Sequence, residues 1–262
     1  MIPVLVFDIE TVPDAAALRR LNGWPAELSE AEVVKRGFAE RLEKTGREFM
    51  PHHLQRVVAI SCVFRDSEGL RIRSLGSLED TEAKLIQDFY RTIEKYSPQL
   101  VSWNGGGFDL PVLHYRSLLH GLVALRYWEL GEDDREFKYN NYINRYHARH
   151  LDLMDVLASY QSRANAPLDD VARLCGFPGK LGMDGSQVWD AYSRGQLAEI
   201  RNYCETDVLN TWLVYCRFQL LRGALSHEAY AAEVALARST LRALPEPHWK
   251  EFLAAWVSVD EP

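Results

Sequence analysis

The 262-residue chain lacks the marks of a membrane or secreted protein. No stretch approaches the roughly 20 apolar residues that a membrane-spanning helix needs. The first apolar run, residues 4–7, is short, has no basic flank and leads directly into Asp8, so it does not read as a secretory signal. We therefore expect a cytoplasmic protein with no membrane partner.

Zinc and disulfide patterns are also missing. The four cysteines lie in apolar contexts at wide, irregular spacing, with no C-x-x-C pair, and no two histidines have the H-x-x-x-H spacing. This pattern predicts reduced core thiols at Cys62, Cys175, Cys204 and Cys216.

The chain also lacks an excess of basic residues. Lys and Arg number 30 against 37 Asp and Glu, which gives a net charge of −7. Such a balance argues against broad adhesion to duplex nucleic acid, which depends on Lys and Arg contacts with phosphate. Internal repeats, low-complexity tracts and clear linkers are absent too. We expect a single domain, residues 1–262, with a core at about 3–221, a helical insertion at about 14–53 and C-terminal helices at about 222–258.

Hydrophobic periodicity indicates an α/β arrangement. The pattern predicts strands at residues 3–9, 56–64, 71–75 and 99–103, with a helix at 78–96. The charged insertion carries helical stretches such as 27–47. From residue 151 onward the chain reads as helices, at 168–175, 186–195, 196–221, 227–244 and 248–257.

Residues 129–150 form an unusual segment in which charges and amides alternate with aromatic residues. One interpretation is an exposed or partly ordered loop. The other is a strip where bases stack on tyrosines while basic side chains meet phosphates. The residues concerned are Phe137, Lys138, Tyr139, Tyr142, Arg145, Tyr146 and Arg149.

The first chemical signal is VLVFDIET, residues 4–11. Side chains two apart on a strand share a face, so Asp8 and Glu10 project together. Two carboxylates side by side in an apolar strand are costly unless a cation lies between them. A metal ion explains the pair, although a strand that ends at the surface is the alternative.

The second signal is LVSWNGGGFDLPVL, residues 100–113, in which a strand runs into three glycines and then into Asp109. Glycines let the backbone turn sharply and approach a ligand closely. Pro111 stands in the first turn of the following helix, where proline is favoured. Asp109 is a second candidate ligand, and a plain helix N-cap is the alternative.

The third signal is NYCETDVLNTWLVY, residues 202–215, in which Tyr203 and Asp207 are four apart on a largely apolar helix. Residues at this spacing lie on one helical face. A carboxylate toward a buried face needs a counter-charge, whereas a solvent-facing aspartate would not. Two further acids, Asp152 and Asp155, fit a helix cap or an ion pair better than a metal site.

In this order the three signals resemble the motifs of the DEDD superfamily of 3′-to-5′ exonucleases. Asn202 stands where the histidine-bearing branch has its base, so the similarity is to the tyrosine-bearing branch, and within it to stand-alone relatives of the proofreading domain of family B DNA polymerases. It covers residues 4–218, and no polymerase palm or fingers motif is present. The matched positions are Asp8 and Glu10, then Asn104, Phe108 and Asp109, then Tyr203 and Asp207.

The resemblance implies an RNase H-like (DnaQ-like) mixed five-stranded sheet flanked by helices and a two-metal mechanism. Its ligands would be Asp8, Glu10, Asp109 and Asp207, and hard oxygen donors of this kind suit Mg²⁺ or Mn²⁺. Tyr203 would orient the attacking water. The negative net charge is compatible with such an enzyme, since carboxylates that hold cations add to it.

The implied substrate is the 3′ end of a single-stranded nucleic acid, with DNA favoured over RNA. The alternatives are an exoribonuclease with the same chemistry and a non-catalytic nucleic-acid-binding domain of the same fold. Trp103 and Phe108 also fit ordinary core positions. We expect substrate contacts from Thr11, Trp103, Asn104, Phe108 and Lys180.

Overall fold

A five-stranded mixed sheet in the order β3-β2-β1-β4-β5 forms the centre of the molecule. The structure, a computed structural model, describes residues 2–256. The first three strands are antiparallel, whereas β4 and β5 run parallel to β1. The bounds are β1 (Val4–Pro13), β2 (Gln55–Asp66), β3 (Gly69–Ser74), β4 (Gln99–Ser102) and β5 (His150–Asp152). The α/β class and the RNase H-like sheet expected from the sequence are confirmed.

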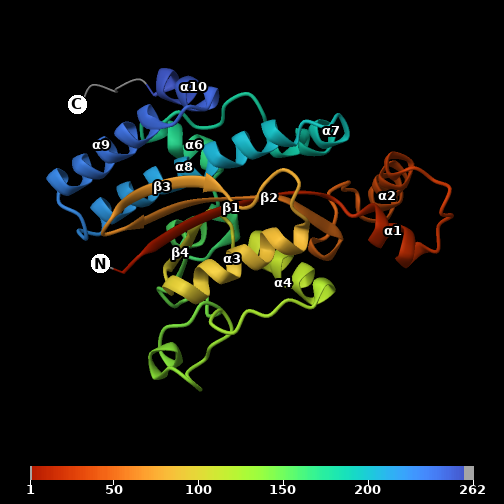
Figure 1. Cartoon of the computed structure of the whole chain (residues 1–262), viewed down its shortest axis with the longest axis horizontal. Coiled ribbons are helices and arrows are strands. Elements are labelled where there is room, and N and C mark those ends of the chain that lie inside the picture. Colours follow the sequence, from red (N-terminus) through yellow and green to blue (C-terminus); the bar gives the residue numbers. More distant parts are fainter. Residues whose placement is uncertain (1, 257–262) are drawn as a thin grey trace.

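Helices cover both faces of this sheet (Figure 1). On one side lie α3 (Glu82–Tyr96) and α4 (Asp109–His120). On the other lies the long helix α8 (Leu197–Leu221), with further helices around it. These are α6 (Leu168–Leu174), α7 (Val188–Ser193), α9 (His227–Ala243) and α10 (Pro247–Ala255).

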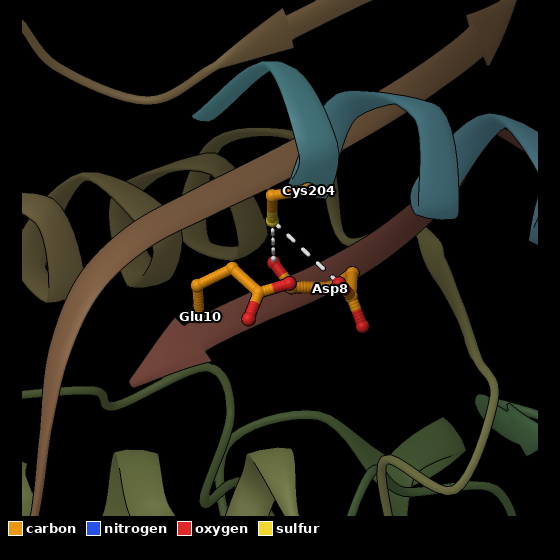
Figure 2. A group of neighbouring side chains, drawn as sticks. All are labelled: Asp8, Glu10 and Cys204. Atoms are coloured by element: carbon orange, nitrogen blue, oxygen red, sulfur yellow. Dashed lines mark hydrogen bonds between the residues drawn. The ribbon is translucent and has the colours of Figure 1, made fainter. Parts of the chain in front are cut away.

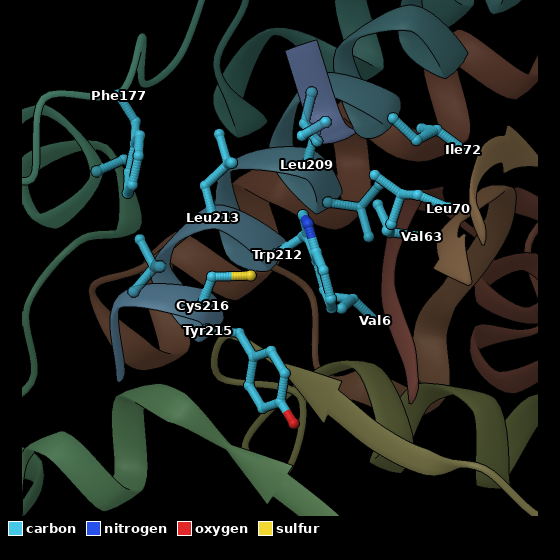
Figure 3. Close-up of a cluster of buried hydrophobic side chains, with 14 of the residues drawn as sticks. Val6, Val63, Leu70, Ile72, Phe177, Leu209, Trp212, Leu213, Tyr215 and Cys216 are labelled. Carbon is cyan, nitrogen blue, oxygen red and sulfur yellow. The ribbon is translucent and has the colours of Figure 1, made fainter. Parts of the chain in front are cut away.

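Alternation along β1 divides the core into two layers. Leu5 and Phe7 pack with α3 and α4, while Val6 joins a cluster built largely from α8. Figure 3 shows Val6 and Trp212 within this second cluster. Since successive side chains point to opposite faces, Asp8 and Glu10 share the α8 side with Val6.

The helical insertion packs beyond the C-terminal end of β1 (Figure 1). It contains α1 (Ala15–Asn22) and α2 (Glu30–Thr45), which surround a small cluster of buried apolar side chains. Asp14 caps α1, and Ser29 with Glu32 forms a capping box at the start of α2. The expectation of a helical insertion between the first two strands is confirmed.

Several boundaries differ from the sequence expectations. Strand β1 extends to Pro13, and α3 begins at Glu82 because Thr81 caps it. The expectation of helices from residue 151 onward is wrong at its start, where β5 ends at Asp152 and a short helix, α5 (Leu153–Leu157), follows. Residues 257 and 258, which we placed in the C-terminal helices, lie outside the described residues.

The segment at residues 129–150 is mostly irregular but has its own buried anchors. Phe137 and Tyr142 are at most 1% exposed, and Arg149 lies over the Phe137 ring at 3.9 Å. These three residues therefore stabilise the segment. Tyr139 and Tyr146 are exposed, so the base-stacking interpretation stays a prediction for them. Within residues 2–256, no helix has the length and apolar character required to cross a bilayer.

Candidate active site

Two carboxylates of the site come from β1. Figure 2 shows Asp8 and Glu10 beside Cys204 of α8, whose thiol donates to the backbone oxygen of Asp8 at 3.5 Å and to its Oδ2 at 3.6 Å. One potential ligand atom from each of these residues lies within 4.8 Å of the others. The strand and the helix thus bring three possible metal ligands together.

The third carboxylate, Asp109, is bound directly to the strand between the first two. Its Oδ1 accepts a hydrogen bond of 3.1 Å from the backbone N–H of Ile9. The helix N-cap interpretation is wrong, because Phe108 occupies the cap position of α4 without a side-chain capping bond. The buried Asp109 carboxylate instead faces β1.

Close contacts require glycine in the turn before Asp109, and one residue of the turn has a left-handed backbone conformation. Asn104 adopts the left-handed φ of 65°. A Cβ at Gly105 would lie 2.3 Å from Ser102 Oγ, and one at Gly107 would lie 2.4 Å from Asn104 Oδ1. Larger residues at these two positions would displace the turn that sets Asp109.

Asp152 holds the same turn from β5. Its two carboxylate oxygens accept the backbone N–H groups of Asn104 and Gly106, each at 2.9 Å. It also accepts from Asp155 N as the N-cap of α5. The expected cap role of Asp152 is confirmed, and its role in shaping the glycine turn could not be seen from the sequence.

Helix α8 supplies Tyr203 and Asp207, and both are buried. Lys180, from the loop after α6, donates to the Tyr203 hydroxyl at 2.6 Å, and its Nζ lies 3.5 Å from Asp207 Oδ2. Asp207 Oδ1 is buried and has no hydrogen-bond partner among the described residues. The solvent-facing interpretation of Asp207 is therefore wrong.

Crowding of buried carboxylates controls the electrostatics. Burial, followed by the charges of Asp109 and Asp207, holds the pKa of Asp8 well above its usual range. The pKa of Glu10 is raised by burial and then by Asp8. Burial also raises the pKa of Asp109 to about 7 and that of Asp207 to about 6. The nearby Lys180 ammonium opposes these shifts at three of the four acids, Asp8, Glu10 and Asp207.

This arrangement fits divalent cations. Hard oxygen ligands are what Mg²⁺ and Mn²⁺ prefer, and the unpartnered Asp207 Oδ1 is a buried acceptor that a cation would satisfy. The Lys180 ammonium offsets the negative charge at only three of the four carboxylates, so additional positive charge would relieve their repulsion. The residues that could hold it are Asp8, Glu10, Asp109 and Asp207.

The other residues expected at the site have different surroundings. Thr11 donates to Gln55 at 3.0 Å, while Trp103 donates to the Ala166 carbonyl and packs against the α8 cluster. Phe108 is partly buried beside the glycine turn. The sequence interpretation missed Cys204 as a neighbour of Asp8, although position 204, three before Asp207, lies on the same helical face.

A family model matches residues 47–256, more than half of the chain. Its description is "predicted 3′-5′ exonuclease related to the exonuclease domain of PolB". The chain belongs to this family. The matched region contains Asp109, Tyr203 and Asp207, whereas Asp8 and Glu10 precede it.

Archaeal DNA polymerases are among the similar proteins. A DNA polymerase of Archaeoglobus fulgidus is 25% identical over 140 residues, which are 52% of this chain and 17% of the polymerase. The structure of the family B DNA polymerase from the hyperthermophilic archaeon Pyrobaculum calidifontis matches 92% of this chain and 29% of its own, with 18% identity and a TM-score of 0.49. The chain thus corresponds to less than a third of either relative.

Proposed function

We propose that this member of the PolB-related exonuclease family is a metal-dependent enzyme that removes nucleotides from the 3′ end of single-stranded nucleic acid, with DNA as the favoured substrate. The observation that carries the proposal is the meeting of four acids from β1, α4 and α8 at one site, with a buried oxygen of Asp207 left unpartnered. The preference for DNA is supported by the similarity to a DNA polymerase.

Asp8, Glu10, Asp109 and Asp207 would hold two divalent ions. When bound, such a pair supplies a lowered pKa for water and stabilises negative charge on the leaving 3′-oxygen. The protein contributes a fixed cage, because Asp109 is tied to the backbone of β1 and the thiol of Cys204 contacts Asp8. A fixed cage avoids the cost of reorganising these groups during the reaction.

Tyr203 serves as a hydrogen-bonding group that orients the attacking water. Burial and the neighbouring charges of Asp207, Glu10 and Asp8 raise its pKa further above its ordinary value near 10. The hydroxyl is therefore neutral at physiological pH and is no general base. Lys180, one third exposed at the edge of the cluster, would meet a substrate phosphate.

The test is degradation of 5′-labelled single-stranded DNA and RNA of the same sequence with Mg²⁺, Mn²⁺ or EDTA. We expect stepwise loss of 3′ nucleotides with either metal ion, faster on DNA, and none in EDTA or with Asp8→Ala. Shortening that persists in EDTA, or that Asp8→Ala leaves unchanged, would show that the metal proposal is wrong. Faster loss from RNA would overturn the DNA preference alone.

A further inference from the structure

Three aromatic rings meet next to the carboxylate site. Phe108, which directly precedes Asp109, has its ring centroid 5.6 Å from that of Phe49 and 5.6 Å from that of His52. The two partners come from the segment between α2 and β2, at the end of the helical insertion. Phe49 is 61% exposed, so its large apolar ring lies at the protein surface.

His52 joins this aromatic cluster to the glycine turn. Its Nε2 lies 3.0 Å from the carbonyl oxygen of Gly107. Because a carbonyl oxygen only accepts, Nε2 must carry the proton and donate it. The insertion is therefore bonded to the turn that sets Asp109.

The backbone around Phe49 is also tied to the strand that carries Asp8. Gln55 accepts from Thr11 Oγ1 at 3.0 Å, and its Nε2 donates to the carbonyl of Met50 at 3.0 Å. The guanidinium of Arg41 donates to the carbonyl of Phe49 itself. Phe49 is thus an exposed side chain on an anchored backbone.

An exposed ring on an anchored backbone is well suited to binding bases. Bases stack on aromatic side chains with little regard to sequence, since every base has a π-face, but a base must first be free of its own stack to do so. The aromatic end of the insertion contacts Phe108, which directly precedes Asp109 in the sequence.

We propose that Phe49, His52 and Phe108 form a nucleobase-binding site for the unpaired bases at the 3′ end of the strand, and that the helical insertion thereby selects single-stranded substrates. The assignment of this site to the 3′ end of the strand, and not to the 5′ end, rests on the proposed function. It adds the contribution of Phe49 and His52, which lie outside the three sequence motifs.

The experiment measures binding of fluorescein-labelled single-stranded DNA by anisotropy, using the full chain with Ca²⁺ in place of Mg²⁺ and checking on a gel that the strand stays intact. The proteins are wild type, Phe49→Ala, Phe49→Trp and Leu21→Ala. Leu21 is an exposed apolar residue of α1 in the same insertion and serves as the matched control. The oligonucleotides carry either ordinary or abasic residues at the last two 3′ positions.

We expect Phe49→Ala to bind the ordinary strand about tenfold more weakly than wild type, a typical loss for one stacked base. The abasic strand should bind equally weakly to both proteins, because base and ring contribute only together. Phe49→Trp should restore binding, and Leu21→Ala should leave it unchanged. Thermal unfolding midpoints of all four proteins show whether any loss comes from misfolding.

Unchanged binding by Phe49→Ala would overturn the inference, as would independent, additive losses from the variant and the abasic strand. The outcome is separable from the proposed function. Absence of hydrolysis with Mg²⁺ or Mn²⁺ would refute the nuclease activity, while coupling between Phe49 and the terminal bases would still establish the base-binding site.

Discussion

Tyr203 is a neutral hydrogen-bonding group at physiological pH. Its raised pKa keeps it protonated, so Tyr203→Phe changes no charge. The substitution removes the neutral hydrogen bond to the attacking water, together with the bond that the hydroxyl accepts from Lys180. We expect kcat to fall about tenfold, the upper value of such a bond. Asp207→Ala removes a metal ligand worth several kcal/mol and should lower kcat by about a hundredfold or more.

The measurement is single-turnover degradation of labelled DNA at saturating Mn²⁺ for both variants. Metal affinity, followed by the paramagnetic signal of Mn²⁺, provides the control: Tyr203→Phe should match wild type and Asp207→Ala should not. Equal and complete loss of turnover in the two variants would mean that the tyrosine does more than orient water.

His150 is a buried residue whose protonation opposes folding. It is 5% exposed, its Nε2 lies 2.9 Å from Ser102 Oγ, and burial lowers its pKa to about 4. A folded-state pKa below the unfolded value near 6.5 means that the unfolded chain binds more protons. Stability from this residue is therefore complete above about pH 6.5 and is lost as the pH falls toward 4, by about 3 kcal/mol at most.

Urea denaturation of wild type and His150→Gln between pH 7.5 and about 4.5 tests this effect. The free energy of unfolding should decline less steeply with acidification in His150→Gln, whatever its value at neutral pH. His227→Gln, at an exposed position, should follow wild type. Parallel curves for wild type and His150→Gln would contradict the prediction.

At the scale of elements, Arg116 of α4 connects the helical insertion to α3. Its guanidinium donates to Asp14 at 2.5 Å and to both oxygens of Glu82 at 2.5 and 2.7 Å. Asp14 caps α1, and Glu82 is the first residue of α3. All three side chains are at most 8% exposed.

Arg116→Leu should therefore be strongly destabilising, by about 3–5 kcal/mol, because two buried carboxylates lose their counter-charge. Arg91→Leu is the matched control: it breaks the exposed pair with Asp88 and should cost about 0.5 kcal/mol or less. Chemical denaturation gives both values. A loss below about 1 kcal/mol for Arg116→Leu would mean that the network contributes little to stability.

The long periodic elements were the ones that the sequence predicted well. The apolar runs of β1 and β2 and the helical spacing in α3 and α8 each extend over many residues. Strand β5 has only three residues and follows an irregular segment, so it is too short to show a hydrophobic period in the sequence. Its position depends on pairing with β4, a long-range contact.

For the site, strand alternation and helical spacing predicted that Asp8 and Glu10, and separately Tyr203 and Asp207, would share a face. Contacts between different strands and helices could not be predicted from these local patterns. The bond from Ile9 N to Asp109 and the approach of Phe49 to Phe108 join residues far apart in the chain. Local patterns carry no signal for them, so only the folded structure brings them together.

For the molecule as a whole, the acidic site lowers the stability of the metal-free protein. Asp8 has its pKa raised by burial and by the charges of Asp109 and Asp207, which means that the folded state at neutral pH is less stable than it would be with a neutral group there. Asp8→Asn should therefore raise the thermal unfolding midpoint in EDTA. Function and stability conflict at this position.

Metal binding should reverse that difference. At a free metal concentration a hundred times the dissociation constant, the free energy of unfolding of wild type should rise by about 2.7 kcal/mol. The rise should be smaller for Asp8→Asn, because a neutral amide replaces the charged carboxylate ligand. Asp133→Asn removes one charge from an exposed loop position and should behave as wild type in both conditions. Calorimetry with Mn²⁺ and with EDTA compares the three proteins. Lower stability of Asp8→Asn in EDTA, or a full stabilisation of it by Mn²⁺, would contradict a carboxylate cluster held together by cations.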